Sequence, residues 1–275
     1  MSNRPSDSEF ERIVQWYPGH MVAAMRRMDE YLQLIDVVIE VVDARVPDSG
    51  ANPALDAISG RRPRLLVLDR EDLADPQLTA RWLRRLGKTR RVVAVNGREQ
   101  TSVAKAASQL EALTANLRGS HRAMVVGVPN SGKSSVINGL LRRSAAKTED
   151  RAGVTRQLQW FRVQANLELM DTPGILVPKI STPDAQWKLA LVGAVPRDRY
   201  DPEDIVTRFH RWLTERTGGR TKVPDLETFV RTRGFMRRGG EADYHNAAQS
   251  YIKDFNDGKF GRITLEAPPD DAEAA

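Results

Sequence analysis

The sequence contains no cysteine among its 275 residues. Disulfide bonds and cysteine-ligated metal sites are therefore excluded, which agrees with the cytoplasmic location that we expect. Long apolar runs are also missing: none approaches the roughly 20 residues that a membrane-spanning helix needs. The first residues are polar and lack the apolar core of a signal peptide. We therefore expect no membrane partner.

The composition is that of a globular protein, with 28% charged and 40% hydrophobic residues. The length suits one large domain or two modest ones. The net charge is +6 and the pI is about 9.7, which indicates a mild preference for polyanions and is weak evidence for nucleic-acid binding.

Short apolar runs alternate with helical stretches over the first two thirds of the chain. This alternation predicts an α/β fold with right-handed crossovers and a mostly parallel sheet. Signals for strands stop beyond Pro183, and the remaining pattern predicts a small all-helical domain. The expected strands are residues 35–43, 64–68, 91–95, 122–126, 158–163 and 167–170.

One motif directly follows the fourth apolar run. Residues 127–134 read G-x-x-x-x-G-K-S and precede a helix-like stretch. This setting predicts a phosphate-binding loop, in which glycines let backbone N–H groups surround an anion at a helix N-terminus. Lys133 is expected to reach the β- and γ-phosphates, and Ser134 to place its hydroxyl on magnesium. The nucleotide-binding residues predicted here are Asn130, Ser131, Gly132, Lys133, Ser134 and Ser135.

A second motif, D-x-x-G, ends the last expected strand at residues 171–174. The Asp171 carboxylate would hold the magnesium, and the Gly174 N–H would meet the γ-phosphate. Thr155 lies between the two motifs, in a polar segment that suits a switch loop closing on the magnesium. A solvent-exposed loop threonine is the alternative. The motifs thus predict Lys133, Thr155 and Gly174 as catalytic residues.

The D-R-E-D segment at residues 69–72 also ends an expected strand, and it looks like an altered N-K-x-D guanine-reading motif. Asp72 keeps the carboxylate that accepts hydrogen bonds from guanine, and Arg70 can stack on the ring. Asp69 replaces an asparagine, and a carboxylate has no donor to offer the guanine acceptors. The alternative is a surface loop with a local ion pair. The loop expected to back the base is formed by Asn96 and Gly97.

The order of these motifs resembles that of a circularly permuted Ras-like GTPase, because the base-side segments precede the phosphate loop. Among permuted GTPases, the chain resembles the bacterial ribosome biogenesis GTPase A family. The resemblance covers roughly residues 16–265. The segments that carry it are residues 16–21 (WYPGHM), 43–47 (DARVP), 127–134, 171–176 (DTPGIL) and 259–262 (KFGR).

The polar first residues predict a flexible N-terminus (residues 1–15), and the composition of the last residues predicts a disordered acidic tail (266–275). The resemblance implies a circularly permuted P-loop GTPase domain (16–182) and a helical RNA- and ribosome-binding domain (183–265). It also implies a GTP-hydrolysing factor that binds the large ribosomal subunit, promotes its late maturation and is released on hydrolysis. The partners would be GTP or GDP and that subunit, and we expect a monomer off the ribosome. A non-catalytic, nucleotide-dependent RNA-binding assembly factor with a degenerate guanine site is the alternative.

The resemblance further implies how hydrolysis is catalysed. Ile175 stands where many GTPases carry a water-orienting glutamine. Asn130 matches a position that helps hold a potassium ion, which would supply charge in place of an arginine finger. His20 matches a family histidine proposed to act on the water, although a structural hydrogen bond at a helix start explains it equally well. We therefore expect slow intrinsic turnover, stimulated by potassium and by the ribosome.

Basic residues are frequent between residues 207 and 238. With the family in view they indicate contacts with ribosomal RNA, whereas a solvated helix face with core phenylalanines is the reading without it. The predicted RNA-binding residues are Arg208, Arg211, Arg231, Arg233, Arg237 and Arg238.

Overall fold

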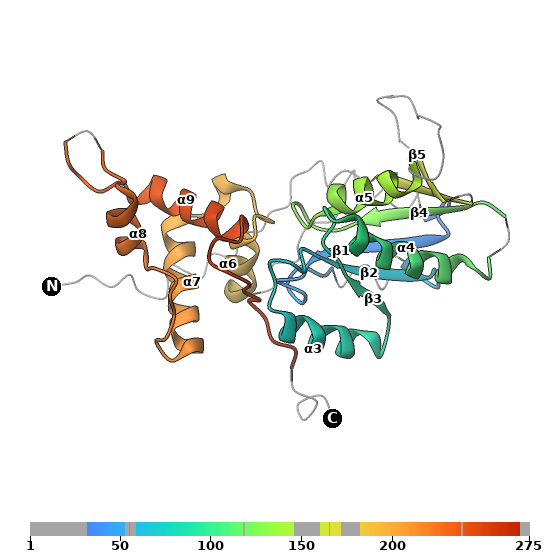
Figure 1. Ribbon diagram of the computed structural model, residues 1–275, viewed down its shortest axis with the longest axis horizontal. Coiled ribbons are helices and arrows are strands. Elements are labelled where there is room, and N and C mark those ends of the chain that lie inside the picture. The colour runs from blue at the N-terminus through green and yellow to red at the C-terminus, as the bar shows by residue number, and fades with distance from the viewer. Residues whose placement is uncertain are drawn as a thin grey trace. The chain divides into compact units, whose positions relative to one another are not determined.

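The computed structural model describes residues 32–52, 55, 59–117, 119–145, 160–164, 166–171, 182–237 and 239–269. The chain divides into two compact units (Figure 1). The first comprises residues 16–179 together with 262–275, and the second contains residues 180–261. Within the described residues, no helix is long and apolar enough to cross a membrane.

The first unit is built on a six-stranded sheet in the order β3-β2-β1-β4-β6-β5. All neighbouring strands pair in parallel except β5 and β6, which are antiparallel. The predicted mostly parallel sheet is therefore confirmed. The strands are β1 (Val37–Asp43), β2 (Arg64–Asp69), β3 (Arg91–Ala94), β4 (His121–Val126), β5 (Trp160–Gln164) and β6 (Leu167–Asp171).

Helices cover both faces of this sheet (Figure 1). α4 (Gln100–Thr114) and α5 (Lys133–Ala145) share one hydrophobic core with alternate residues of the strands. α3 (Pro76–Gly87) packs on the other face through Trp82. β1 is buried along its whole length, because a central parallel strand is covered on both sides.

The start of α3 shows how the sequence fixes a helix end. The Asp75 carboxylate accepts the N–H groups of Gln77 and Leu78, and Pro76 fills the first turn, where no N–H is needed. This cap begins α3 soon after β2, so the short loop between them stays at the carboxyl end of β2.

The described residues of the second unit form helices and one isolated antiparallel bridge, between Met236 and Ala242. The helices are α6 (Pro183–Leu191), η2 (Arg197–Arg199), α7 (Pro202–Thr217), α8 (Leu226–Arg233) and α9 (Tyr244–Asn256). Aromatic rings form its core: the Phe209 and Phe255 centroids lie 5.1 Å apart, and those of Phe229 and Tyr251 lie 5.0 Å apart. Phe229 is therefore a core residue and is not available to stack on RNA.

Residues 262–269, here called the C-terminal strap, lie against the first unit. The Ile263 N–H donates to Leu73 O and the Leu265 N–H to Arg45 O, at 3.0 and 2.8 Å. The Trp82 indole donates to Glu266 O at 3.0 Å. From the sequence, residues 262–265 are expected in the helical domain and residues 266–269 in a disordered tail. The structure instead pairs both segments with the sheet-containing unit, through contacts that lie far apart in the sequence.

Candidate nucleotide-binding site

The carboxyl ends of β1 and β4 mark the point where the chain changes direction across the sheet. From β1 the chain builds outward to β2 and β3, and it then returns to the opposite side of β1 as β4. Ligands of open parallel sheets bind in the crevice at such a switch point. The residues after β4 are the G-x-x-x-x-G-K-S motif, so the fold puts this loop at the expected ligand crevice.

Backbone geometry of the loop depends on its glycines. A methyl group at Gly127 would lie 2.3 Å from Val41 O, so the loop is pressed against β1. Gly132 has φ +101°, and a methyl group there would lie 1.8 Å from Asp69 Oδ2. Asn130 adopts φ 56°, a left-handed conformation that asparagine tolerates better than most residues. These positions give the loop the curvature that an anion cradle requires.

Two polar side chains in the loop, Lys133 and Ser131, have unusual hydrogen bonding. The Lys133 ammonium donates to Gly127 O and Val128 O, at 2.8 and 2.7 Å, so it lies across the inside of the loop. Ser131 Oγ is buried and has no hydrogen-bond partner among the described residues. An unpaired buried hydroxyl costs about 1–3 kcal/mol. A loop that concentrates such groups is typical of a binding site and not of a turn selected for stability.

Asp69 joins the base-side segments to the phosphate loop. Its Oδ1 accepts the Gly97 N–H at 2.7 Å, and its Oδ2 lies under Gly132. The side chain is only 2% exposed. Asp69 is therefore held inside the protein as a tie between three loops. In this structure the Asp69 carboxylate faces Gly97 and Gly132, whereas the altered motif predicts that it faces the guanine acceptors.

Burial raises the pKa of the Asp69 carboxyl from 3.8 to about 6. The Gly97 and Arg70 backbone N–H groups and the Arg70 charge oppose this rise, and the nearby Asp43 carboxylate adds to it. Because the pKa in the folded protein exceeds the ordinary value, protonated Asp69 is the form that folding favours. Its contribution to stability is complete below pH 3.8 and is lost as the pH rises through about 6.

We expect an Asp69→Asn variant to be more stable than the native chain at neutral pH, because its amide resembles the protonated carboxyl. The gain in the free energy of unfolding should be about 3 kcal/mol above pH 7 and close to zero near pH 4. Urea unfolding of both proteins across this pH range measures it. A difference that did not change with pH would contradict the assigned environment of Asp69.

Arg70 is turned towards β1. It has φ 62°, and its Nη1 lies 3.0 Å from Asp43 Oδ2. Arg45 contacts the same carboxylate through Nε and Nη2, at 2.9 and 2.7 Å, and is 1% exposed. Although burial acts to raise the Asp43 pKa, the Arg45 and Arg70 charges outweigh it and lower the pKa. The D-A-R segment thus anchors the base-side loop, and stacking of Arg70 on a base stays a prediction.

In the rest of the D-R-E-D loop, Glu71 is held by hydrogen bonds and Asp72 is exposed to solvent. Glu71 Oε1 accepts the Ser102 hydroxyl at 2.6 Å and the Lys105 ammonium at 3.1 Å. Arg262 of the C-terminal strap donates to Glu71 O at 2.7 Å. Asp72 is exposed at the tip of this turn and has no hydrogen-bond partner in the described chain. Asp72 is therefore free to accept donors from a ligand.

Gly97 fits against Asp69 because it has no side chain. A methyl group there would lie 2.9 Å from Asp69 Oδ1 and 3.0 Å from the Val136 N. Asn96 folds locally, since its Oδ1 accepts the Arg98 N–H at 3.0 Å. A larger residue at position 97 would therefore clash with Asp69.

Several predicted site residues lie outside the described residues, namely His20, Thr155, Gly174 and Arg238. Asp171 ends β6 opposite Val125 of β4, which brings its backbone to the same edge as the phosphate loop, while its side chain is not described. Ser134 and Asn130 are exposed, whereas Lys133 and Ser135 are partly buried. The structure therefore brings the described parts of all three motifs to one edge.

The predicted RNA-binding arginines have two kinds of surroundings. Arg208, Arg233 and Arg237 pair with carboxylates of their own unit, Asp204, Asp254 and Asp243, at 3.0, 2.9 and 3.6 Å. Arg211 and Arg231 are exposed and form no ion pair with another described residue. Among the described arginines predicted to bind RNA, these two have no carboxylate within ion-pair distance.

Sequence reasoning did not assign the roles of Arg45 or Glu266. Arg45 belongs to the DARVP segment, and an arginine two residues after a buried aspartate is a signal for a local ion pair. The Glu266 carboxylate accepts the Asp48 N–H at 2.8 Å and also binds the Ser49 hydroxyl. These contacts span more than 200 residues, and nothing in the local sequence indicates them.

The sheet order, the phosphate loop after β4 and the base-side loop after β2 define a circularly permuted P-loop GTPase. A family model described as "50S ribosome-binding GTPase" matches residues 122–201 and begins within β4, downstream of the base-side segments. Ribosome biogenesis GTPase A of Bacillus licheniformis is 36% identical over 282 residues, covering 94% of this chain and 99% of that protein. The Thermotoga maritima protein of that name is 32% identical and covers 94% of the chain. The chain belongs to the ribosome biogenesis GTPase A family.

A solved structure supports the same assignment. GNP-bound YlqF from T. maritima matches with a TM-score of 0.72 and 30% sequence identity, covering 90% of this chain and 99% of that chain. The GDP-bound structure of YlqF matches with a TM-score of 0.70.

Proposed function

We propose that the protein binds and hydrolyses GTP, and that it assembles transiently with the large ribosomal subunit during its late maturation. The observation that carries this proposal is the loop at residues 127–134, whose G-x-x-x-x-G-K-S sequence lies at the switch point of the sheet, next to the Asp69–Gly97 tie. The names of the related proteins supply the ribosomal context.

The residues present suit a magnesium ion. Ser134 is exposed in the first turn of α5, and Asp171 ends the strand next to β4. A hydroxyl and a carboxylate are the oxygen ligands that magnesium prefers beside a nucleotide phosphate. Together with Thr155 they would hold the ion, which neutralises charge on the β- and γ-phosphates when bound. Asn130, exposed in the phosphate loop, is the proposed potassium ligand.

The chain's own groups then position the phosphates. Lys133 would exchange its bonds to Gly127 O and Val128 O for bonds to phosphate oxygens, because a charged donor gains more from an anion than from carbonyls. Backbone N–H groups of residues 130–135 would complete the cradle at the α5 N-terminus. Ile175 offers no group that orients water, so we propose slow turnover off the ribosome and a contribution from His20, Thr155 and Gly174.

Phosphate release tests this proposal. Purified protein is incubated with GTP or ATP, in potassium or sodium, with and without large ribosomal subunits. We expect slow release from GTP alone, faster release with potassium and subunits, and little release from ATP. Release of the protein from subunits should follow hydrolysis, measured by sedimentation with GTP and with a non-hydrolysable analogue.

Two results would change the assignment. Tight binding of GTP without hydrolysis under every condition would favour the non-catalytic assembly factor. Equal use of GTP and ATP would show that Asp72 and its loop do not select guanine.

A further inference from the structure

The end of α3 and the start of β3 carry a dense group of cations. We call Arg81, Arg84, Arg85, Lys88, Arg90 and Arg91 the α3 basic ridge; these six lie within eleven residues that contain no Asp or Glu. The local charge of +6 equals the formal net charge of the whole chain. Such clustering on one element is the electrostatic footprint of a polyanion-binding surface.

Four of the six ridge side chains have no carboxylate partner among the described residues. These four are Arg84, Arg85, Arg90 and Arg91. Two of them donate to neutral oxygens: Arg85 to Pro269 O and Arg91 to the Gln109 amide oxygen, each at 3.4 Å. In the helical unit, by contrast, three of the five described arginines that are predicted to bind RNA are paired with carboxylates.

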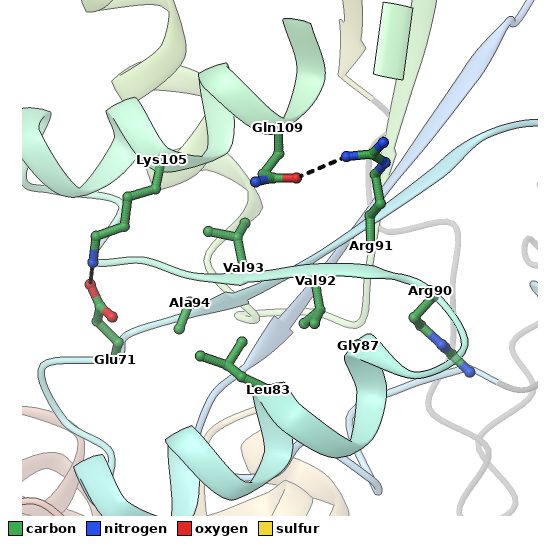
Figure 2. Close-up of a pocket in the computed structure, with 10 residues that line it drawn as sticks. All are labelled: Glu71, Leu83, Gly87, Arg90, Arg91, Val92, Val93, Ala94, Lys105 and Gln109. Carbon is green, nitrogen blue, oxygen red and sulfur yellow. Dashed lines mark hydrogen bonds and ion pairs between the residues drawn. The ribbon is translucent and has the colours of Figure 1, made fainter. Parts of the chain in front are cut away.

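A hollow beside the ridge extends this surface towards α4. It has a volume of about 440 Å³ and lies over β3, the edge strand of the sheet. Figure 2 shows Leu83 and Gly87 of α3 on one side, with Lys105 and Gln109 of α4 on the other. Arg90, Arg91 and Lys105 stand around it, and Glu71, the one carboxylate among the described lining residues, pairs with Lys105 at 3.1 Å.

Two ordinary explanations account for only part of the ridge. Cations in the last turn of a helix interact favourably with its dipole, and this explains Arg84 and Arg85. Charged residues on an edge strand also discourage pairing with another sheet, and this explains Arg91. Neither explains six cations without any acidic residue, continuing from a helix through a turn and into a strand.

The ridge lies away from the nucleotide site. β3 (Arg91–Ala94) begins next to the ridge, and the chain then continues to Asn96 and Gly97, so the ridge and the base-side loop lie at opposite ends of this strand. The hollow runs between them, because its lining includes Glu71 of the base-side loop. A ligand on the ridge and a nucleotide at residues 127–134 could therefore bind at the same time.

From these observations we propose that the α3 basic ridge and its hollow bind the phosphate backbone of RNA, so that the GTPase unit itself holds the polyanion. This inference rests on the proposed ribosomal function and adds a contact surface that the helical unit does not supply. Guanidinium groups without carboxylate partners are suited to bidentate contacts with phosphate. The hollow gives the surface the concave form that a rounded nucleic-acid backbone requires.

A matched pair of variants tests the proposal. Arg84→Gln/Arg85→Gln removes two ridge charges, and Arg142→Gln/Arg143→Gln removes an equivalent L-R-R pair from the last turn of α5. Affinity for a short RNA duplex of generic sequence is measured for the GDP-bound full chain across a range of salt. If two phosphate contacts are lost, the slope of log affinity against log salt should fall by about 1.8, with binding roughly 60-fold weaker at about 0.1 M salt.

The control pair should leave both the slope and the affinity nearly unchanged, and GDP affinity should be the same in all three proteins. Equal weakening by the two pairs would overturn the proposal, because general charge would then explain it. Normal RNA binding by the ridge variant together with lost subunit binding would assign the ridge to an acidic protein instead. If the native chain bound subunits and the ridge variant matched it in every assay, the inference would be wrong and the proposed function would stand. If the native chain did not bind subunits at all, both the inference and the proposed function would be wrong.

Discussion

Replacing Asp43 by alanine should lower the free energy of unfolding by about 3–5 kcal/mol, because it leaves the Arg45 guanidinium buried without its main counter-ion. Arg45 is 1% exposed and Asp43 is 2% exposed, so water cannot replace the lost carboxylate. Arg70 would lose the same partner, and the base-side loop that follows it should loosen. Urea unfolding at neutral pH measures the stability, and GTP affinity reports on the loop.

The pH dependence gives this prediction a second readout. The arginines hold the Asp43 pKa below its usual value, so its stabilisation is present above the ordinary pKa of an aspartate and is lost as the pH falls. The difference between native and variant should therefore narrow in acid. Glu168→Ala, which removes a more exposed pair with Arg122 at 3.7 Å, should cost less than about 1 kcal/mol. A similar cost for both variants would show that the Asp43 network is not a buried anchor.

Replacing Lys133 by glutamine should reduce the rate of GTP hydrolysis by roughly 10²–10³, because a charged donor aimed at the phosphates is lost. Glutamine keeps much of the side-chain length and can still donate to the loop carbonyls, so the fold should be preserved. Single-turnover phosphate release on subunits measures the rate, and thermal unfolding checks the structure.

Lys253→Gln is a suitable control, because Lys253 is 65% exposed and lies on α9 in the other unit. This variant should hydrolyse GTP at the native rate. A Lys133→Gln protein that retained hydrolysis within a few-fold would place the phosphates elsewhere and would remove the loop at residues 127–134 from the mechanism.

Periodic patterns in the sequence predicted the sheet-forming segments well. The run expected at residues 35–43 became β1 (Val37–Asp43), and the run at 91–95 became β3 (Arg91–Ala94). These elements depend on local alternation and on burial, which neighbouring residues report directly. The phosphate loop could be predicted equally well, because its residue spacing and its flanking strand and helix are local features of the sequence.

The surroundings of Asp69 could not be predicted in the same way. Its partner Gly97 lies 28 residues along the chain, and the contact with Gly132 depends on how two loops meet after folding. Residue type alone suggested a carboxylate facing a base, whereas packing turned it inward. The α3 basic ridge differs, since its charges are visible in the sequence. Only the structure shows that Arg84, Arg85, Arg90 and Arg91 have no carboxylate partner among the described residues.

The C-terminal strap changes how the helical unit is classified. The chain leaves the GTPase unit after residue 179 and re-enters it at Arg262, which bonds to the carbonyls of Glu71 and Ala74. The helical unit is thus an insertion within the GTPase fold, fastened covalently at both ends, and not an appendage. A chain cut after residue 182 would lose more than helices: it would uncover Trp82 and remove the Arg262 clamp beside the proposed guanine-reading loop. The isolated GTPase part would then be an incomplete fold.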